Sequence, residues 1–469
     1  MAAETAQEET PAPVTVAKGG RGSSGANEKN STQNFPDRPA NLATVQKAVG
    51  HFQRKEQVSE KRASTSLYEA SLRFDSWPKV PLGEVVTLQR GFDLPAHKRK
   101  PGKVPIVSSS GVSDYHSEVG VKSPGVVTGR YGTIGQVFFI KEDYWPLNTT
   151  LWVNDFHGND PLFTSYLLRT IDFQSCSDKS SVPGVNRNDL HRIPVSLPPL
   201  AEQKRIASIL GALDNKTELN RRMNAKLEDM ARTLFKSWFV DFDPVRAKLD
   251  GRLPAGMDAN TAALFPDAFE ESALGLIPKG WKVLPVGDVV ECVGGSTPST
   301  AVPSYWEGGT HHWTTPKDFS TLQSPILLDT SRKITDSGLK QISSGLLPSG
   351  TLLMSSRAPV GYLAISVMPV AINQGFIAMK SNAKASNYFM LNWCQTNMLE
   401  IEVRATGTTF PEISKQNFRP ILLLLPSMEV VASFTAKVKP LYEQITINLN
   451  QAQTLSKLRD SLLPMLLNR

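Results

Sequence analysis

The chain has 469 residues, of which 40% are hydrophobic and 20% charged, an ordinary balance for globular domains. Its formal net charge of +7 favours a polyanionic partner without requiring one. Three widely separated cysteines argue against a disulfide framework or a structural zinc site. Because there is also no long apolar run or signal-peptide core, we expect a cytoplasmic protein without membrane contact.

Residues 1–75 form an N-terminal extension whose structure and role the sequence leaves uncertain. The first forty residues are rich in Ala, Thr, Pro, Gly, Ser and Asn and poor in large apolar side chains. A segment of this composition buries too little apolar surface to offset the conformational entropy lost on ordering the chain. We therefore predict disorder there, and residues 41–75 give only a weak indication of helix.

A globular domain is predicted over residues 76–198, because short β-type runs such as 104–107 and 136–140 are bounded there by turn residues. Its densest basic cluster lies among prolines and glycines, so we place it on a loop; its cations are Lys98, Arg99, Lys100 and Lys103. A solvated loop and a DNA phosphate contact are about equally good interpretations. Ser109 and Ser110 lie in a Ser-Ser-Ser-Gly run, which is more often a turn than a binding site.

Two long spacer helices are predicted, over residues 199–240 and 426–469. In each, five positions recur every seven residues, four of them apolar and the central one asparagine. This pattern predicts a coiled-coil seam, in which a polar position sets register at some cost in stability. The seam residues are Ile206, Leu213, Asn220, Leu227 and Leu234 in the first helix and Phe434, Leu441, Asn448, Leu455 and Leu462 in the second. Solvent exposure of both asparagines is the alternative, and Pro440 predicts a break or a start of the second helix.

The chain is internally duplicated. Residues 182–234 align without a gap on residues 410–462, and the segment WPKVPLGEVV at 77–86 resembles WKVLPVGDVV at 281–290. A second domain like the first is therefore predicted over residues 281–425, after a proline- and glycine-rich connector at 241–280. The expected fold class is α+β, with two similar β-rich mixed domains separated by an antiparallel coiled coil and related by a pseudo-two-fold axis.

An arginine follows a β-type run in each copy and marks a corner. The corner Arg130–Gly135 of the first copy matches Arg357–Gly361 of the second, which is one residue shorter, so the two arginines align. Tyr131 and Ser356 beside them are further candidates. Arginine there could bind guanine or phosphate, or it could anchor the corner by bonding to backbone carbonyls. Lys317 and Trp313 are further contact candidates in the second domain. Neighbouring His311 and His312 rarely chelate a metal together, so we predict no metal site.

The junctions between these parts resemble those of the specificity subunits of type I restriction-modification systems. The resemblance rests on residues 182–190 (VPGVNRNDL), 197–206 (LPPLAEQKRI), 236–245 (KSWFVDFDPV) and 277–281 (IPKGW). It covers about residues 75–469, including the order of parts. It implies two target recognition domains that each read half of a split double-stranded DNA sequence.

The same resemblance implies partners and cofactors. The helices would dock two methyltransferase subunits, which bind S-adenosylmethionine and methylate adenine, and the complex would include restriction subunits that use ATP and Mg. No cofactor is expected on this chain. Phosphate-binding, dinucleotide-binding and methyltransferase motifs are absent from its sequence, so we predict no catalytic residue.

Two alternatives stay open at this stage. One is a DNA methyltransferase or nuclease with an unfamiliar active site, and the other is a coiled-coil scaffold that binds proteins. In the DNA-reading interpretation, the 28 residues from Ile206 to Leu234 span about 42 Å at about 1.5 Å per residue. That length corresponds to roughly 12 base pairs between the centres of the two half-sites.

Overall fold

The computed structural model describes residues 77–176, 184–382, 384–407, 409 and 411–467. All of them belong to one compact unit, residues 75–469. The predicted extension over residues 1–75 lies outside the described residues. Within the described part of the chain, no helix is long and apolar enough to cross a membrane.

Domain 1, the described part of residues 77–199, contains a four-stranded sheet of order β2-β8-β5-β6 and a three-stranded sheet of order β4-β3-β7. Strands β1 and β9 pair antiparallel and bring the two ends of the domain together. The strands are β1 (Lys79–Pro81), β2 (Thr87–Arg90), β3 (Val104–Ser108), β4 (Gly111–His116), β5 (Gly125–Gly129), β6 (Val137–Ile140), β7 (Trp145–Pro146), β8 (Thr150–Asp155) and β9 (Pro194–Ser196). The helices are α2 (Leu82–Val85), η1 (Ala96–Lys98), α3 (Pro161–Arg169) and α4 (Arg187–His191).

Domain 2, the described part of residues 281–427, repeats this topology with one strand added, β15. Its sheets have the order β13-β20-β17-β18-β15 and β16-β14-β19, and β12 pairs with β21. The strands are β12 (Lys282–Pro285), β13 (Glu291–Val293), β14 (His311–Thr314), β15 (Ile326–Leu327), β16 (Arg332–Ile334), β17 (Leu352–Ser356), β18 (Val360–Ser366), β19 (Val370–Ile372), β20 (Phe376–Lys380) and β21 (Leu422–Leu425). The helices are α8 (Val286–Val289), η2 (Pro303–Tyr305), α9 (Pro316–Phe319), α10 (Asp336–Leu339), α11 (Asn387–Thr396), α12 (Met398–Val403) and α13 (Lys415–Phe418).

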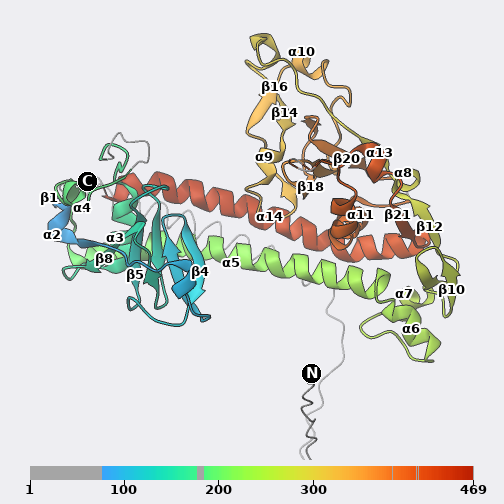
Figure 1. The fold of residues 1–469 in the computed structure, drawn as a ribbon, viewed down its shortest axis with the longest axis horizontal. Coiled ribbons are helices and arrows are strands. Elements are labelled where there is room, and N and C mark those ends of the chain that lie inside the picture. The colour runs from blue at the N-terminus through green and yellow to red at the C-terminus, as the bar shows by residue number, and fades with distance from the viewer. Residues whose placement is uncertain (1–76, 177–183, 383, 408, 410, 468–469) are drawn as a thin grey trace, which may run out of the picture. The chain divides into compact units, whose positions relative to one another are not determined.

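Two 40-residue helices, α5 (Leu200–Phe239) and α14 (Met428–Leu467), pack against each other. They are antiparallel, because Asp214 bonds to Arg459 whereas Asn224, further along α5, bonds to the earlier residue Asn448. Figure 1 shows the pair running side by side, with domain 1 near the start of α5 and domain 2 near the start of α14. The predicted α+β fold class, with two similar domains and an antiparallel helix pair, is confirmed.

The ten predicted seam residues are all buried or half-buried. At the centre of the seam, Asn220 and Asn448 are only 1% and 4% exposed, so neither points to solvent. Asn220 Nδ2 donates to Gln451 Oε1 at 2.8 Å, and Asn448 Nδ2 donates to Asn224 Oδ1 at 2.8 Å. Because a buried amide is costly without partners, these cross-helix bonds favour a single register of the two helices.

Pro440 does not break the second helix, and the expectation that it would is wrong. α14 continues through both Pro440 and Pro464. A proline leaves the carbonyl four residues earlier without its helical donor. Here Ala436 and Pro440 are both exposed, so water can solvate that carbonyl.

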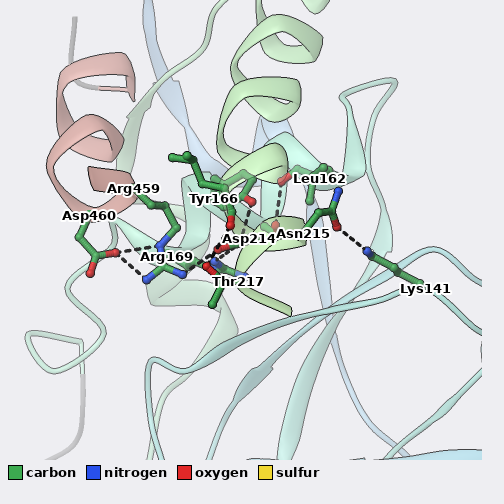
Figure 2. A network of polar contacts seen from close by, with 11 residues as sticks. Lys141, Leu162, Tyr166, Arg169, Asp214, Asn215, Thr217, Arg459 and Asp460 are labelled. Carbon is green, nitrogen blue, oxygen red and sulfur yellow. Dashed lines mark hydrogen bonds and ion pairs between the residues drawn. The ribbon is translucent and has the colours of Figure 1, made fainter. Parts of the chain in front are cut away.

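A polar network attaches domain 1 to the helix pair (Figure 2). Half-buried Asp214 of α5 accepts from Tyr166 Oη at 2.7 Å, from Arg169 at 3.2 Å and from Arg459 of α14 at 2.8 Å. Burial alone would raise the pKa of Asp214, but the hydrogen bonds from Arg459 and Tyr166 outweigh it and hold the pKa below its usual value. One carboxylate thus ties α3, α5 and α14 together.

Domain 2 is attached to the helix pair by aromatic packing instead. Phe235, Phe239, Phe389 and Phe434, from α5, α11 and α14, have ring centroids 4.9 to 6.4 Å apart. Such pairs stabilise beyond the area that they bury. The connector adds to this core through Val245 and Phe265, and it contains α6 (Asp243–Leu249), α7 (Ala259–Ala263) and a hairpin of β10 (Phe269–Ser272) and β11 (Gly275–Pro278).

Candidate nucleic-acid interface

The corner after β5 and the corner after β17 are equivalent in their backbone hydrogen bonds. Val185 N donates to Arg130 O at 3.0 Å in domain 1, and Ile413 N donates to Ser356 O at 2.9 Å in domain 2. The next residues form the bridges Tyr131–Gly184 and Arg357–Glu412. Arg130 therefore corresponds to Ser356, and Tyr131 corresponds to Arg357.

This register corrects the sequence alignment, in which the two arginines occupied the same position. The second corner is one residue shorter, and the sequence does not show where the missing residue falls. Successive residues of an extended backbone point to opposite sides. The one-residue displacement therefore means that Arg130 and Arg357 are not equivalent side chains.

The loops after β2, β3, β5 and β7 in domain 1 gather at one end of its sheets. We call this set of loops the loop edge of domain 1, and the loops after β13, β14, β17 and β19 form the loop edge of domain 2. Phe92 N donates to Pro146 O at 2.8 Å, Leu147 N to Val107 O at 2.9 Å and Arg130 N to Thr149 O at 2.8 Å. In domain 2 the equivalent bonds are Ser296 N to Ile372 O, Asn373 N to Thr314 O and Ser356 N to Gly375 O, at 3.1, 3.2 and 2.8 Å. These bonds make Val107 of domain 1 equivalent to Thr314 of domain 2; beyond them domain 1 turns into β4, whereas domain 2 enters α9, which contains Lys317.

The loop edge of domain 2 holds a hollow of about 440 Å³ that brings two predicted residues together. Lys317 and Arg357 both line it, together with Thr315, Pro316, Ser320, Ala358 and Asn373. The guanidinium of Arg357 lies 3.6 Å from the carboxylate of Glu412, and both side chains are about 40% exposed. Two cations with hydroxyl and amide groups in a concave surface can donate to phosphates or to base edges.

The loop edge of domain 1 has different side chains on the same backbone. Arg130 lies over the ring of Tyr131, with 4.5 Å from its guanidinium carbon to the ring centroid. Tyr131 is 40% exposed. A Cβ on Gly132 would lie 3.5 Å from Ser109 Oγ, so the predicted residues Ser109, Arg130 and Tyr131 come together. A cation stacked on an aromatic ring is a surface suited to bases and phosphates.

Comparison with known proteins decides the family. The model of the type I restriction modification DNA specificity domain matches residues 75–229 and 278–457, one segment for each domain with most of its helix. The chain belongs to this family. Its two domains are specificity domains, and the helices α5 and α14 lie largely within the two matched segments.

Individual proteins similar to this chain are also described as type I specificity subunits. The MjaIX specificity subunit of Methanocaldococcus jannaschii is 37% identical over 163 residues, which cover 34% of this chain and 38% of that protein. The HindI specificity subunit of Haemophilus influenzae is 26% identical over 333 residues, covering 62% of this chain and 72% of that protein. The type I S subunit from M. genitalium has a similar fold, with a TM-score of 0.53 at 15% identity over 85% of this chain and 99% of that one.

The basic cluster of the first specificity domain is less charged than its sequence suggests. Lys98 ends η1 and Lys103 precedes β3, so Lys103 lies at the opposite end of that strand from Ser109. Arg99 pairs with Asp114 at 2.9 Å, and Lys100 pairs with Glu118 at 2.7 Å. The hydrogen bond from Arg99 lowers the pKa of Asp114, and the one to Glu118 raises the pKa of Lys100. Two of the four cations are thus offset locally, although such exposed pairs are weak.

The serine run of this specificity domain is bonded within its own turn. Ser108 Oγ donates to Gly111 O at 3.0 Å, accepts from Ser110 N at 3.4 Å, and lies 3.1 Å from Ser110 Oγ. The hydroxyl of Ser108 therefore helps to hold the turn, and Ser109 and Ser110 are carried on it at the loop edge. Whether they bind DNA stays a prediction.

In the second specificity domain, Trp313 is 2% exposed and packs with Trp306, their ring centroids 5.0 Å apart. The expectation of a DNA contact there is wrong, because β14 turns the indole into a small apolar cluster with Ile334. His311 bonds to Asp336 at 2.6 Å and His312 lies 3.1 Å from Asp329. Among the described residues no group of three or more His, Cys, Asp or Glu could hold a metal.

The sequence did not point to several loop-edge residues. Asp93 accepts a hydrogen bond from Asn148 in the first specificity domain. At the equivalent positions of the second, Thr297 donates to Gln374 at 2.6 Å. Glu412 was also missed, although it lies two residues after the start of the second repeat copy at residue 410. No local motif marks these residues, because only the strand register brings them to the loop edge.

Proposed function

We propose that this chain is the DNA sequence-recognition subunit of a cytoplasmic type I restriction-modification complex. Each specificity domain binds one half of an interrupted, asymmetric double-stranded DNA sequence through its loop edge. The chain itself catalyses no reaction. The candidate contacts are Lys98, Arg99, Lys100, Lys103, Ser109, Ser110, Arg130 and Tyr131 in domain 1 and Lys317, Ser356 and Arg357 in domain 2.

One observation carries this proposal: two domains with one backbone plan differ in side chains at equivalent positions of their loop edges. Arg130 stands where domain 2 has Ser356, and Tyr131 stands where it has Arg357. Different donors and acceptors at the same positions suit two different half-sites. The antiparallel helix pair keeps the two domains at opposite ends of one rigid element, which suits a target with a fixed gap.

The helices support the further proposal that two methyltransferase subunits dock on this chain. Leu219 of α5 and Ile447 of α14, 228 residues apart like the rest of the repeat, are 43% and 60% exposed. Met230 and Leu458, separated in the same way, are 57% and 45% exposed. Apolar side chains kept on a solvent face at duplicated positions suit two copies of one partner. S-adenosylmethionine, ATP and Mg would then be bound by the methyltransferase and restriction subunits.

Selection from a random pool of DNA duplexes tests the proposal. The full chain, assembled with its methyltransferase subunits, should enrich a motif of two unlike half-sites separated by a gap of constant length. Binding should weaken steeply with salt, because each phosphate contact releases counterions. A single continuous motif, or binding without sequence preference, would refute the proposal.

A further inference from the structure

The two loop edges differ at the corner bridge. Domain 2 has Arg357 opposite Glu412, whereas domain 1 has Tyr131 opposite Gly184. A Cβ on Gly184 would lie 2.4 Å from the Tyr131 ring, so the ring fills the space that a side chain would need. The two domains therefore present different chemistry at one position of a shared backbone plan: an aromatic ring in one and an ion pair in the other.

The ion pair of domain 2 is held in place by its backbone. Glu412 N donates to Thr406 O and Thr406 N donates to Glu412 O, both at 2.9 Å. On the other side, Ile413 N donates to Ser356 O, also at 2.9 Å. Glu412 is thus fixed between two neighbouring segments, and its side chain is 44% exposed beside the 39% exposed side chain of Arg357. A ligand can reach both groups without moving the backbone.

Glu412 places a negative charge at a surface otherwise suited to DNA. A phosphate would be repelled by this carboxylate, so the pair is poorly suited to the DNA backbone. In the major groove, however, cytosine presents the N4 amino donor, for which carboxylates are the matching acceptors. Guanine presents the O6 and N7 acceptors, for which arginine is the commonest partner.

The spacing of the pair matches one base pair. Guanine O6 and cytosine N4 lie about 2.9 Å apart because they hydrogen-bond to each other. The nearest guanidinium nitrogen and carboxylate oxygen of Arg357 and Glu412 lie 3.6 Å apart. We propose that Arg357 and Glu412 together read a single G·C base pair in the half-site of domain 2, Arg357 donating to guanine and Glu412 accepting from cytosine N4. This inference rests on the proposed DNA recognition.

Lys317 completes the arrangement. It lines the same hollow as Arg357, so the hollow keeps a net positive charge although Glu412 offsets Arg357. The lysine is available for a neighbouring phosphate, which positions the domain without reading sequence. Domain 1, with Tyr131 and Gly184, has no ion pair to read G·C at its equivalent position.

The test uses the full chain with its methyltransferase subunits and a random pool of DNA duplexes as the probe. Arg357→Ala and Glu412→Ala should relax the same single G·C position in one half-site, each lowering the preference roughly tenfold or more. The other half-site should stay unchanged, and the remaining positions of the altered half-site should be kept, which shows that domain 2 of the variants is folded. Glu291→Ala is the matched control, because the exposed pair Lys380–Glu291, at 2.9 Å, lies at the far end of β20.

The outcomes separate the inference from the function on which it rests. If Glu412→Ala raises affinity for all sequences and leaves the motif unchanged, Glu412 only weakens the contact between Arg357 and DNA, and the inference is wrong. Relaxation of two different positions, or of neither, overturns it equally while leaving bipartite recognition intact. If the unaltered complex enriches no bipartite motif, the proposed function itself fails.

Discussion

Shortening the helix pair should shorten the gap in the DNA target by a predictable amount. The perturbation is the joint deletion of residues 220–226 from α5 and 448–454 from α14, one heptad from each, which keeps the proposed docking residues Leu219 and Ile447. These segments face each other, because Asn220 bonds to Gln451 and Asn224 bonds to Asn448. The deletion removes the buried amides of both helices together, so none of them is left without a partner. Gln444, which donates to Asn448, is exposed and can hydrogen-bond to water instead.

The magnitude follows from helix geometry. Seven residues at about 1.5 Å each shorten the pair by about 10.5 Å, or roughly three base pairs at about 3.4 Å each. Seven residues fall only about 20° short of two helical turns, so the domains keep nearly the same facing. Three base pairs, in contrast, rotate DNA by about 100°. We therefore expect a gap shorter by about three base pairs, together with weaker binding.

Selection from a random duplex pool with the shortened complex reads out the gap directly. Both half-sites should be recovered with their sequences unchanged, since no loop-edge residue is touched. Deletion of residues 220–226 alone is the control, because it leaves the opposite heptad of α14 without its partner and should abolish a constant gap. Recovery of the original gap by the doubly shortened chain would refute the idea that the helices set the distance.

Three further predictions concern how the parts are held together. Asp214→Asn should destabilise domain 1 by about 2 kcal/mol in thermal unfolding, because charged hydrogen bonds are lost. The pKa of Asp214 is lowered in the folded state. The stabilisation by Asp214 is therefore fully present above the unfolded pKa of about 3.9 and vanishes as the pH falls through the lower folded pKa. Asn448→Leu should cost about 1–3 kcal/mol in denaturant unfolding, since it leaves buried Asn224 without its donor; no loss would mean that the amides are not coupled. Leu219→Asp should change the free energy of unfolding by no more than about 0.5 kcal/mol. Mass measurement should show one bound methyltransferase subunit instead of two, and Ile447→Asp should remove the other subunit. A double variant that still binds two methyltransferase subunits would contradict docking at Leu219 and Ile447.

The sequence predicted the features that depend on periodicity and repetition. Heptad spacing identified both long helices and their seam, since the burial of a helix face requires apolar residues at that interval. The gapless repeat required two copies of one domain. The asparagines of the seam were placed correctly because both copies keep them at the same heptad position.

Features that depend on register across distant strands were not predictable. The one-residue displacement of Arg357 relative to Arg130 appears only in two backbone hydrogen bonds. Val185 N donates to Arg130 O, whereas Ile413 N donates to Ser356 O. Trp313 resembled a surface aromatic, but β14 turns it into the domain. The partners of Arg99 and Lys100 lie 15 and 18 residues away, and no local pattern indicates such pairs.

The most direct measurement of the proposed role is genome-wide mapping of methylated adenines in host cells, with this gene present and with it deleted. We predict that one split motif, with two unlike half-sites and a constant gap, is methylated only when the gene is present. Replacement of residues 77–198 by those of a relative should then change one half of that motif. Methylation that persists without the gene, or a motif that changes in both halves, would contradict recognition by two separate domains.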